Sequence, residues 1–215
     1  MSKGRELSVY STPNAVAALV LAHGAGAGQR SGFMVGTAKA LSARGILTAT
    51  FDFPYMADGR HVPDKGPVLE EAWRQAVDAA RAHAEFDRLA LFIGGKSMGG
   101  RIASQAAAAS TLPIAGLVYL GYPLHPPGKP DQPRDRHLPD IKSPMLFVQG
   151  TRDAFGTSDE IRALLPRLNA GTVLHEIVGG DHSFKVPARA GRPQAAVMDE
   201  LFDTVASFIR SVAGV

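Results

Sequence analysis

The chain contains 215 residues, of which 45% are hydrophobic, and this suits a single domain with a sizeable core. Zero cysteines exclude disulfides, thiolate metal sites and a cysteine nucleophile, and they are compatible with the cytoplasmic localisation that we expect. The net charge is only +3 and the Lys and Arg residues are scattered, so nucleic acid is not an expected partner. The polar first residues do not resemble a secretory signal, and the chain lacks an apolar run of about 18 residues, so no membrane partner is expected.

Predicted strands and helices alternate along the chain. A short edge strand is expected within residues 5–12, and longer apolar runs predict buried strands at 15–28, 46–56, 114–124, 144–151 and 172–180. Helical spacing of apolar residues predicts helices at 31–43, 68–84, 158–171 and about 193–212, while residues 89–110 combine a strand, a sharp turn and a helix. This order predicts an α/β fold in which helices cover both faces of a mostly parallel sheet, with residues 1–215 forming one domain.

The turn within residues 89–110 organises the rest of the chain. Gly95, Ser97 and Gly99 form the pattern G-x-S-x-G between an apolar strand and a helix, which predicts a nucleophile elbow. A Cβ at either glycine would clash in so tight a turn, and the serine hydroxyl would be exposed at the carboxyl edge of the sheet. The N–H of Met98, at the start of the helix, is expected to stabilise a developing negative charge.

Two other interpretations of this turn are weaker. A flexible Gly/Ser loop would not join an apolar strand directly to a helix. The phosphate-binding pattern G-x-x-x-x-G-K-[ST] shares its second half with Gly95-Lys96-Ser97, but Ala90 stands where its first glycine is required. The nucleophile elbow is therefore the preferred interpretation.

Chemically active residues also follow other predicted strands, at the sheet edge where ligands bind. Asp153 follows the strand at 144–151, and His182 follows the strand at 172–180. A serine needs an imidazole to take its proton, and the imidazole needs a carboxylate to fix its tautomer and stabilise its charge. The chain order Ser97, Asp153, His182 is the one expected for this type of sheet, and it predicts a catalytic triad.

The glycine-rich segment 23–28, HGAGAG, follows the first long strand. Its glycines let backbone N–H groups approach a reacting carbonyl, so Ala25 is expected to donate an oxyanion-hole hydrogen bond alongside Met98. Gln29 replaces the third glycine of a dinucleotide-binding motif, and no H-x-x-x-H or carboxylate cluster is present, so no cofactor or metal is expected. His23 ends the strand and is expected to be a packed support.

Three further residues are weaker candidates for chemistry. Asp52 follows a strand but comes too early in the chain order. Asp181 adjoins His182 and is expected to cap its loop. His175 lies in the middle of a predicted strand, so structural roles are preferred for all three residues.

The segments HGAGAG, GKSMGG, GTRD and GGDHSF, in this order over residues 23–184, resemble the α/β-hydrolase superfamily, nearest to its small dienelactone-hydrolase-like branch. The resemblance covers most of the chain and implies an eight-stranded, mostly parallel sheet, so about seven to eight strands are expected, with Ser/Asp/His catalysis and no cofactor. The segments GYPLHPPGKP and QGTRDAFG further resemble a poorly characterised subgroup of predicted hydrolases, one of whose vertebrate relatives belongs to a chromatin acetyltransferase complex. Three features depart from the family: Lys96 replaces the usual His or aromatic residue, Ser97 replaces the cysteine of true dienelactone hydrolases, and a separate lid domain is lacking.

These features predict a serine hydrolase that cleaves carboxylic esters or thioesters of small molecules through an acyl-enzyme. The alternative is a non-catalytic interaction module of a larger complex, suggested by the chromatin-complex relative and by Lys96 beside the nucleophile. The sequence does not indicate an oligomeric state.

Residues 122–144 stand where this family commonly inserts a lid. With seven prolines the segment is too broken for a helical cap, so a shallow, open site with a preference for short acyl chains is expected. Tyr122 and His125 in this segment, together with Lys96, are candidate substrate contacts, although Lys96 could instead reach solvent. The segment forms either a solvated loop or a positive rim over the site, the basic residues being His125, Lys129, Arg134, Arg136 and His137.

Overall fold

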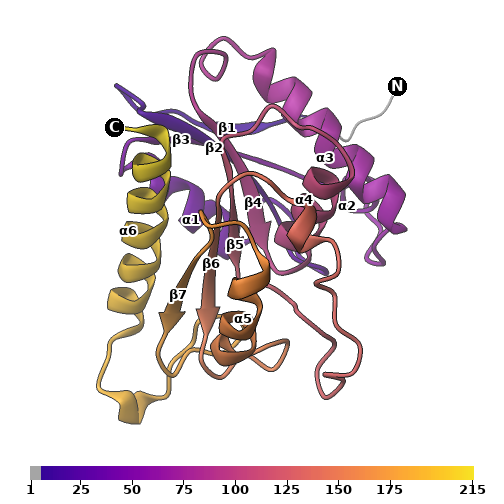
Figure 1. Cartoon of the computed structure of the whole chain (residues 1–215). Helices are drawn as coiled ribbons and strands as arrows, with labels where there is room; N and C mark the ends of the chain where they lie inside the picture. Colours follow the sequence, from indigo (N-terminus) through magenta and orange to yellow (C-terminus); the bar gives the residue numbers. More distant parts are fainter. Residues whose placement is uncertain (1–5) are drawn as a thin grey trace.

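The computed structural model describes residues 6–215 and contains one sheet with helices on both sides (Figure 1). Its strands are β1 (Ser8–Tyr10), β2 (Ala17–Ala22), β3 (Ile46–Phe51), β4 (Leu91–Lys96), β5 (Gly116–Leu120), β6 (Met145–Gly150) and β7 (Val173–Ile177). They pair in the order β1-β3-β2-β4-β5-β6-β7, and all neighbours are parallel except β1 and β3. The predicted α/β class with a mostly parallel sheet is confirmed, with seven strands in the described part of the chain.

The helices of the described residues are α1 (Gly32–Ser42), α2 (Pro54–Ala57), α3 (Gly66–Arg81), α4 (Met98–Ala109), α5 (Ser158–Leu164) and α6 (Gln194–Ala213). Two predicted boundaries shift at prolines. The strand expected at 46–56 ends at Phe51, and Pro54 begins α2. The helix expected at 158–171 ends at Leu164, where a 3-10 turn over Leu165–Arg167 includes Pro166. Within residues 6–215, no helix has both the length and the apolar composition needed to cross a membrane.

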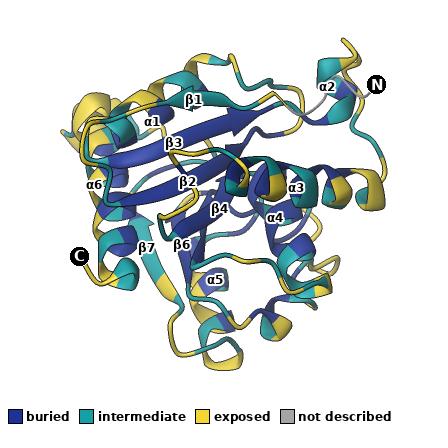
Figure 2. Cartoon of the chain, turned by 90° about the horizontal axis from the view of Figure 1, so that it is seen from above, coloured by how far each residue is buried: buried dark blue, intermediate teal, exposed yellow. Residues whose placement is uncertain are grey.

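The sheet separates two hydrophobic cores. Side chains alternate between its faces, so on β2 Ala18 and Val20 pack on one side while Leu19 and Leu21 pack on the other. The first core also holds residues of α3, α4 and α5, including the fully buried Trp73, and the second holds residues of α1 and α6. Figure 2 shows the central strands in the colour of buried residues, with exposed residues on the outer sides of the helices. Burial on both faces explains the continuous apolar runs of these strands.

The carboxyl ends of the parallel strands lie along one edge of the sheet. Strand β4 is central, paired with β2 through Ala22 and Gly95 and with β5 through Lys96 and Leu120. The loops after β2, β4, β6 and β7 therefore leave the sheet at the same edge. Between β5 and β6, the described segment 121–144 contains only a 3-10 helix, Leu138–Asp140, in agreement with the expected lack of a separate lid domain.

Candidate active site

Ser97 lies in a strained turn between β4 and α4. Its φ of 52° and ψ of −118° place a residue with a side chain in a sparsely populated backbone region. Neighbouring backbone comes so close that a Cβ at Gly95 would lie 2.1 Å from the carbonyl oxygen of Ala22, and one at Gly99 would lie 2.3 Å from the same atom. The clash that the sequence predicts at both glycines is confirmed, and the local chain path is that of a nucleophile elbow.

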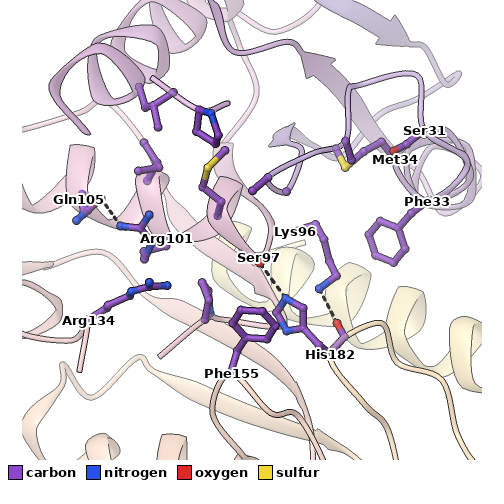
Figure 3. A pocket seen from close by; sticks show the side chains of 18 of the residues that line it. Ser31, Phe33, Met34, Lys96, Ser97, Arg101, Gln105, Arg134, Phe155 and His182 are labelled. Carbon is purple, nitrogen blue, oxygen red and sulfur yellow. Dashed lines mark hydrogen bonds between the residues drawn. The ribbon is translucent and has the colours of Figure 1, made fainter. Parts of the chain in front are cut away.

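His182 and Asp153 form a hydrogen-bonded chain with Ser97. The Ser97 hydroxyl lies 2.8 Å from Nε2 of His182, and Nδ1 of His182 lies 2.8 Å from Oδ2 of Asp153 (Figure 3 draws the first of these contacts). Asp153 is buried, whereas Ser97 and His182 are partly exposed. When Nδ1–H donates to the carboxylate, Nε2 is free to accept the serine proton, as a general base must. The structure thus brings together the three residues that the sequence selects.

Two further groups hold the carboxylate of Asp153. The N–H of Phe155 donates to Oδ1 at 2.8 Å, and the side-chain amide of Gln149 donates to Oδ2 at 3.0 Å. Gln149 is fully buried on β6, where it also donates to the carbonyl oxygen of Gly156 at 2.6 Å and accepts the N–H of Tyr122 at 2.8 Å. Sequence reasoning missed Gln149; the available signal was a lone polar residue in the apolar strand that ends just before Asp153.

The loop that carries His182 is held from two directions. The ring of Phe155 packs against the imidazole, with the ring centroids 4.2 Å apart. Oδ1 of Asp181 accepts the N–H groups of Ser183 at 2.8 Å and Lys185 at 2.9 Å, which confirms that Asp181 caps its own loop. These contacts limit reorientation of the imidazole and keep Nε2 directed at the serine hydroxyl.

The two expected oxyanion donors, Met98 and Ala25, line the cavity at Ser97. Met98 is the first residue of α4, so its N–H has no carbonyl partner within the helix, and the helix dipole favours negative charge there. The glycine-rich segment approaches the nucleophile closely, since a Cβ at Gly24 would lie 3.5 Å from Cβ of Ser97. This arrangement can present two backbone donors to a carbonyl oxygen bound beside Ser97.

His23, Asp52 and His175 have structural partners, as the sequence predicts. His23 is fully buried, its Nε2 accepts a backbone N–H at 3.2 Å, and burial lowers its pKa. Asp52 accepts the N–H of Gln29, directly after the glycine-rich segment, at 2.7 Å, and His175 contacts a carboxylate of α6 at 2.8 Å. These three residues do not line the cavity at Ser97.

The side chain of Lys96 turns toward His182 and not toward solvent. Its Nζ donates to the backbone carbonyl oxygen of His182 at 2.5 Å and lies 5.4 Å from the centroid of the Phe184 ring. Burial lowers the pKa of Lys96 to about 8, although nearby carboxylate charges oppose the shift. Lys96 lines the cavity, as expected of a substrate contact, but its ammonium group is already bound to the protein.

Ser97 and His182 line a cavity of about 640 Å³, a size typical of small-ligand sites. One part of its wall is apolar and another carries positive charge (Figure 3). Pro123 and Arg134 come from the segment 122–144, so this segment rims the cavity as predicted. Arg101 also lines the cavity and was not selected from the sequence; its position four residues after Ser97, one turn along α4, is the signal that could have found it.

Residues 15–210 match the family model described as "Alpha/beta hydrolase domain". The chain belongs to the α/β-hydrolase family. The dienelactone hydrolase from Anabaena variabilis is 20% identical and superposes with a TM-score of 0.75 over 95% of this chain and 90% of its own. An α/β serine hydrolase without a lid from Xanthomonas campestris is 19% identical, with a TM-score of 0.70 over 95% and 88% of the two chains. Est1E from Butyrivibrio proteoclasticus, solved with ferulic acid bound, is 16% identical, with a TM-score of 0.64 over 94% and 95%. At these identities the three structures show a common fold.

Tyr122 and His125 do not line the cavity of this α/β hydrolase, which corrects their selection as substrate contacts. The left-handed conformation of Gly121, with a φ of 68°, turns the chain so that Tyr122 is fully buried and its hydroxyl donates to the carbonyl oxygen of Arg134 at 2.9 Å. His125 is only 6% exposed and contacts a carboxylate of α5 at 3.1 Å. Of the basic residues expected to form a positive rim, Arg134 alone lines the cavity in the described structure.

Proposed function

We propose that this α/β hydrolase cleaves carboxylic esters or thioesters of small molecules through an acyl-enzyme intermediate. The observation that carries the proposal is the chain from Ser97 through His182 to Asp153, with 2.8 Å at each contact, in the wall of a cavity. A serine hydroxyl is a weak nucleophile near neutral pH, and a chain of this kind is what activates it.

In the acylation half, Oγ of Ser97 attacks the carbonyl carbon of the substrate while Nε2 of His182 takes the hydroxyl proton. The carbonyl oxygen becomes an oxyanion that accepts hydrogen bonds from the N–H groups of Met98 and Ala25. Asp153 keeps Nδ1 of His182 protonated and stabilises the imidazolium. His182 then gives its proton to the leaving alcohol or thiol, and the acyl group stays on Ser97.

In the deacylation half, a water molecule takes the place of the leaving group. His182 removes one proton from this water, whose oxygen attacks the acyl carbon and forms a second oxyanion at Met98 and Ala25. The bond to Oγ breaks, the carboxylic acid leaves, and Ser97 regains its proton from His182. The residues named supply every proton transfer, so the proposal includes no cofactor or metal.

The size and lining of the cavity support a small, short-acyl substrate. The lining of the cavity includes apolar side chains that suit a short hydrocarbon group, among them Phe33, Met34, Leu69 and Ile102. The segment 122–144 rims the cavity but has no long helix to enclose an extended chain.

Labelling with a fluorophosphonate, followed by mass spectrometry of the adduct, tests the proposal. We expect labelling at Ser97 in the native protein, and no labelling or ester turnover by the Ser97→Ala variant. Ser183→Ala is the matched control, because Ser183 lines the same cavity but its hydroxyl lies outside the triad. Equal ester turnover by the native and Ser97→Ala proteins would overturn the proposal and favour the non-catalytic interaction module instead.

A further inference from the structure

Two arginine side chains in the cavity have no part in the proposed chemistry. The backbone N–H of Arg101, in the first turn of α4, donates to the carbonyl oxygen of Ser97 at 3.1 Å, so this side chain begins one turn from the proposed nucleophile. Arg134 comes from the segment between β5 and β6, and both residues line the cavity that contains Ser97. In Figure 3 their side chains lie on the opposite side of Ser97 from Phe33 and Met34.

Both arginines extend from fixed backbone. The N–H of Arg134 donates to the carbonyl oxygen of Leu124 at 2.7 Å, and its carbonyl oxygen accepts the hydroxyl of the fully buried Tyr122 at 2.9 Å. The backbone of Arg101 is part of α4. Because the backbone at both arginines is already ordered, ligand binding does not have to order a mobile loop as well.

Neither guanidinium group has an ion-pair partner in residues 6–215. The Arg101 side chain makes one hydrogen bond, from Nη1 to the amide oxygen of Gln105 at 3.2 Å, and its Nε is buried without a partner. Asp64 is the one carboxylate among the described lining residues, and it is paired with Arg60 at 2.7 Å. The charge of Glu70 favours protonated Arg101, but Glu70 forms no ion pair with it. The cavity therefore holds two guanidinium groups with unused N–H donors.

This arrangement is unfavourable when no anion is bound. Burial and the like charge of Arg134 lower the pKa of Arg101, which means that its protonated form is destabilised. A guanidinium nevertheless remains protonated in proteins, so the repulsion is not relieved by loss of a proton. An oxyanion that reaches both groups would accept their free N–H donors and offset the repulsion.

We propose that Arg101 and Arg134 bind a terminal oxyanion, a carboxylate or phosphate group, on the substrate, so that the enzyme prefers esters with a second, negatively charged end. This inference rests on the proposed ester hydrolysis and specifies its substrate class. The planar fork of a guanidinium group matches the oxygen pair of either anion, whereas the ammonium of Lys96 is engaged by the carbonyl of His182.

The test compares kcat/KM for two pairs of esters matched in size. In one pair the charge is on the acyl side, 4-nitrophenyl hydrogen glutarate against 4-nitrophenyl methyl glutarate; in the other it is on the alcohol side, 4-acetoxybenzoate against its methyl ester. We expect the native enzyme to prefer the anionic member of one pair by about tenfold or more. Arg101→Gln and Arg134→Gln should each reduce this ratio, chiefly through KM.

Three controls make the result specific. Arg136→Gln should keep the native ratio, because Arg136 is an exposed residue near Arg134 that does not line the cavity. Arg101→Lys keeps the charge without the fork, so an intermediate ratio is expected, and circular dichroism checks that each variant is folded. Competitive inhibition by glutarate or by inorganic phosphate identifies which oxyanion the site takes.

Failure of this inference is distinguishable from failure of the proposed function. If both members of each pair are cleaved equally, or if the preference survives in the double variant Arg101→Gln/Arg134→Gln, the anion site is wrong while ester hydrolysis stands. If no ester is cleaved and Ser97 is not labelled, hydrolysis is wrong. Calorimetric titration of the Ser97→Ala protein with glutarate and with phosphate then decides the anion site: binding that the two arginine substitutions abolish supports it, and no binding overturns it.

Discussion

The ammonium of Lys96 donates a hydrogen bond of 2.5 Å to the backbone carbonyl oxygen of His182, so the residue before the proposed nucleophile holds the loop of the proposed base. Gly121 makes this contact possible, because a Cβ there would lie 2.9 Å from Nζ of Lys96 and 3.2 Å from the carbonyl oxygen of His182. We therefore expect Lys96 to position the loop of His182, in place of the solvent-reaching role that a surface lysine usually has.

We expect kcat/KM to fall on the alkaline side as Lys96 loses its proton. The pKa of Lys96 is lowered to about 8 by burial, so the ammonium dominates below that pH and the neutral amine, a weaker donor, dominates above it. Lys96→Arg should move the fall in rate above a pH of about 10, and Lys96→Met should remove it while lowering kcat on the order of tenfold at neutral pH. The measurement is a pH–rate profile of each protein with a neutral ester. A fall near pH 8 that persists in Lys96→Met would assign it to another group.

The same desolvation predicts how Lys96→Met changes the pH dependence of stability. The pKa of Lys96 in the folded protein, about 8, lies below the unfolded value of about 10.4, so the unfolded state binds more protons between them. The resulting penalty is fully present below pH 8 and is lost as the pH rises to about 10.4. The native protein should therefore gain stability relative to the Lys96→Met variant as the pH rises from 8 to about 10.4, a difference to be measured by urea unfolding of both proteins at pH 7 and at pH 10. An unchanged difference between the two proteins across this range would show that burial does not lower the pKa of Lys96.

Gln149→Met should reduce both stability and activity. The substitution removes a donor to Asp153 and leaves the buried N–H of Tyr122 and the carbonyl oxygen of Gly156 without their partner, which costs about 1–3 kcal/mol for each buried group. We expect a lower free energy of unfolding in urea and a lower kcat, because Asp153 is less firmly oriented. Gln132→Met, a change at an exposed position, is the control. Unchanged kcat in Gln149→Met would show that the remaining contacts suffice to orient Asp153.

The cavity predicts a preference for short acyl chains. We expect kcat/KM for neutral nitrophenyl esters of two to sixteen acyl carbons to be highest at the short end, because a cavity of about 640 Å³ rimmed by a loop has little apolar wall for a long chain. We also expect no jump in rate above the micellar threshold. A maximum at the long end would mean that the segment 122–144 moves to form a tunnel.

Ser97→Gly should be more stable than Ser97→Ala, although neither variant can be acylated at this position. Both lack the hydroxyl group, but alanine keeps the Cβ that makes a φ of 52° with a ψ of −118° unfavourable, whereas glycine does not. Relief of this strain is expected to contribute about 1 kcal/mol, an effect to be measured as a higher Tm. Equal Tm values for the two variants would show that the turn stores no strain.

The sequence predicts an element correctly where its local amino-acid pattern agrees with the surroundings that the element has in the folded protein. Buried parallel strands must be apolar throughout, and the elbow must have glycine at positions 95 and 99, so both could be read directly. The meeting of Ser97, Asp153 and His182 was predictable because strand order fixes where loops meet: Asp153 and His182 follow strands whose carboxyl ends lie at the edge that carries Ser97.

Side-chain direction outside regular elements could not be predicted in this way. Tyr122 follows a strand end like the triad residues, but the left-handed turn at Gly121 directs it into the core. In the sequence, Arg101 resembles an ordinary charged residue on an amphipathic helix. Its lack of an ion-pair partner in residues 6–215 is visible only once the neighbouring segments are folded. Gln149 differs from its apolar neighbours in sequence, but its link to Asp153 depends on a turn back at the end of β6.

Trp73 is the chain's one tryptophan, so its fluorescence follows the unfolding of one part of the sheet. Its Nε1–H donates to the carbonyl oxygen of Gly99 at 3.1 Å, and its ring packs edge-on against Phe51 at 4.9 Å, so its fluorescence reports on α3, α4 and β3. Asp153 and His182 follow β6 and β7, at the other end of the strand order from β3. If ester turnover is lost at a lower denaturant concentration than the one that changes the emission, the first opening lies outside the contacts of Trp73, whereas coincident losses would mean that the sheet opens as one cooperative unit.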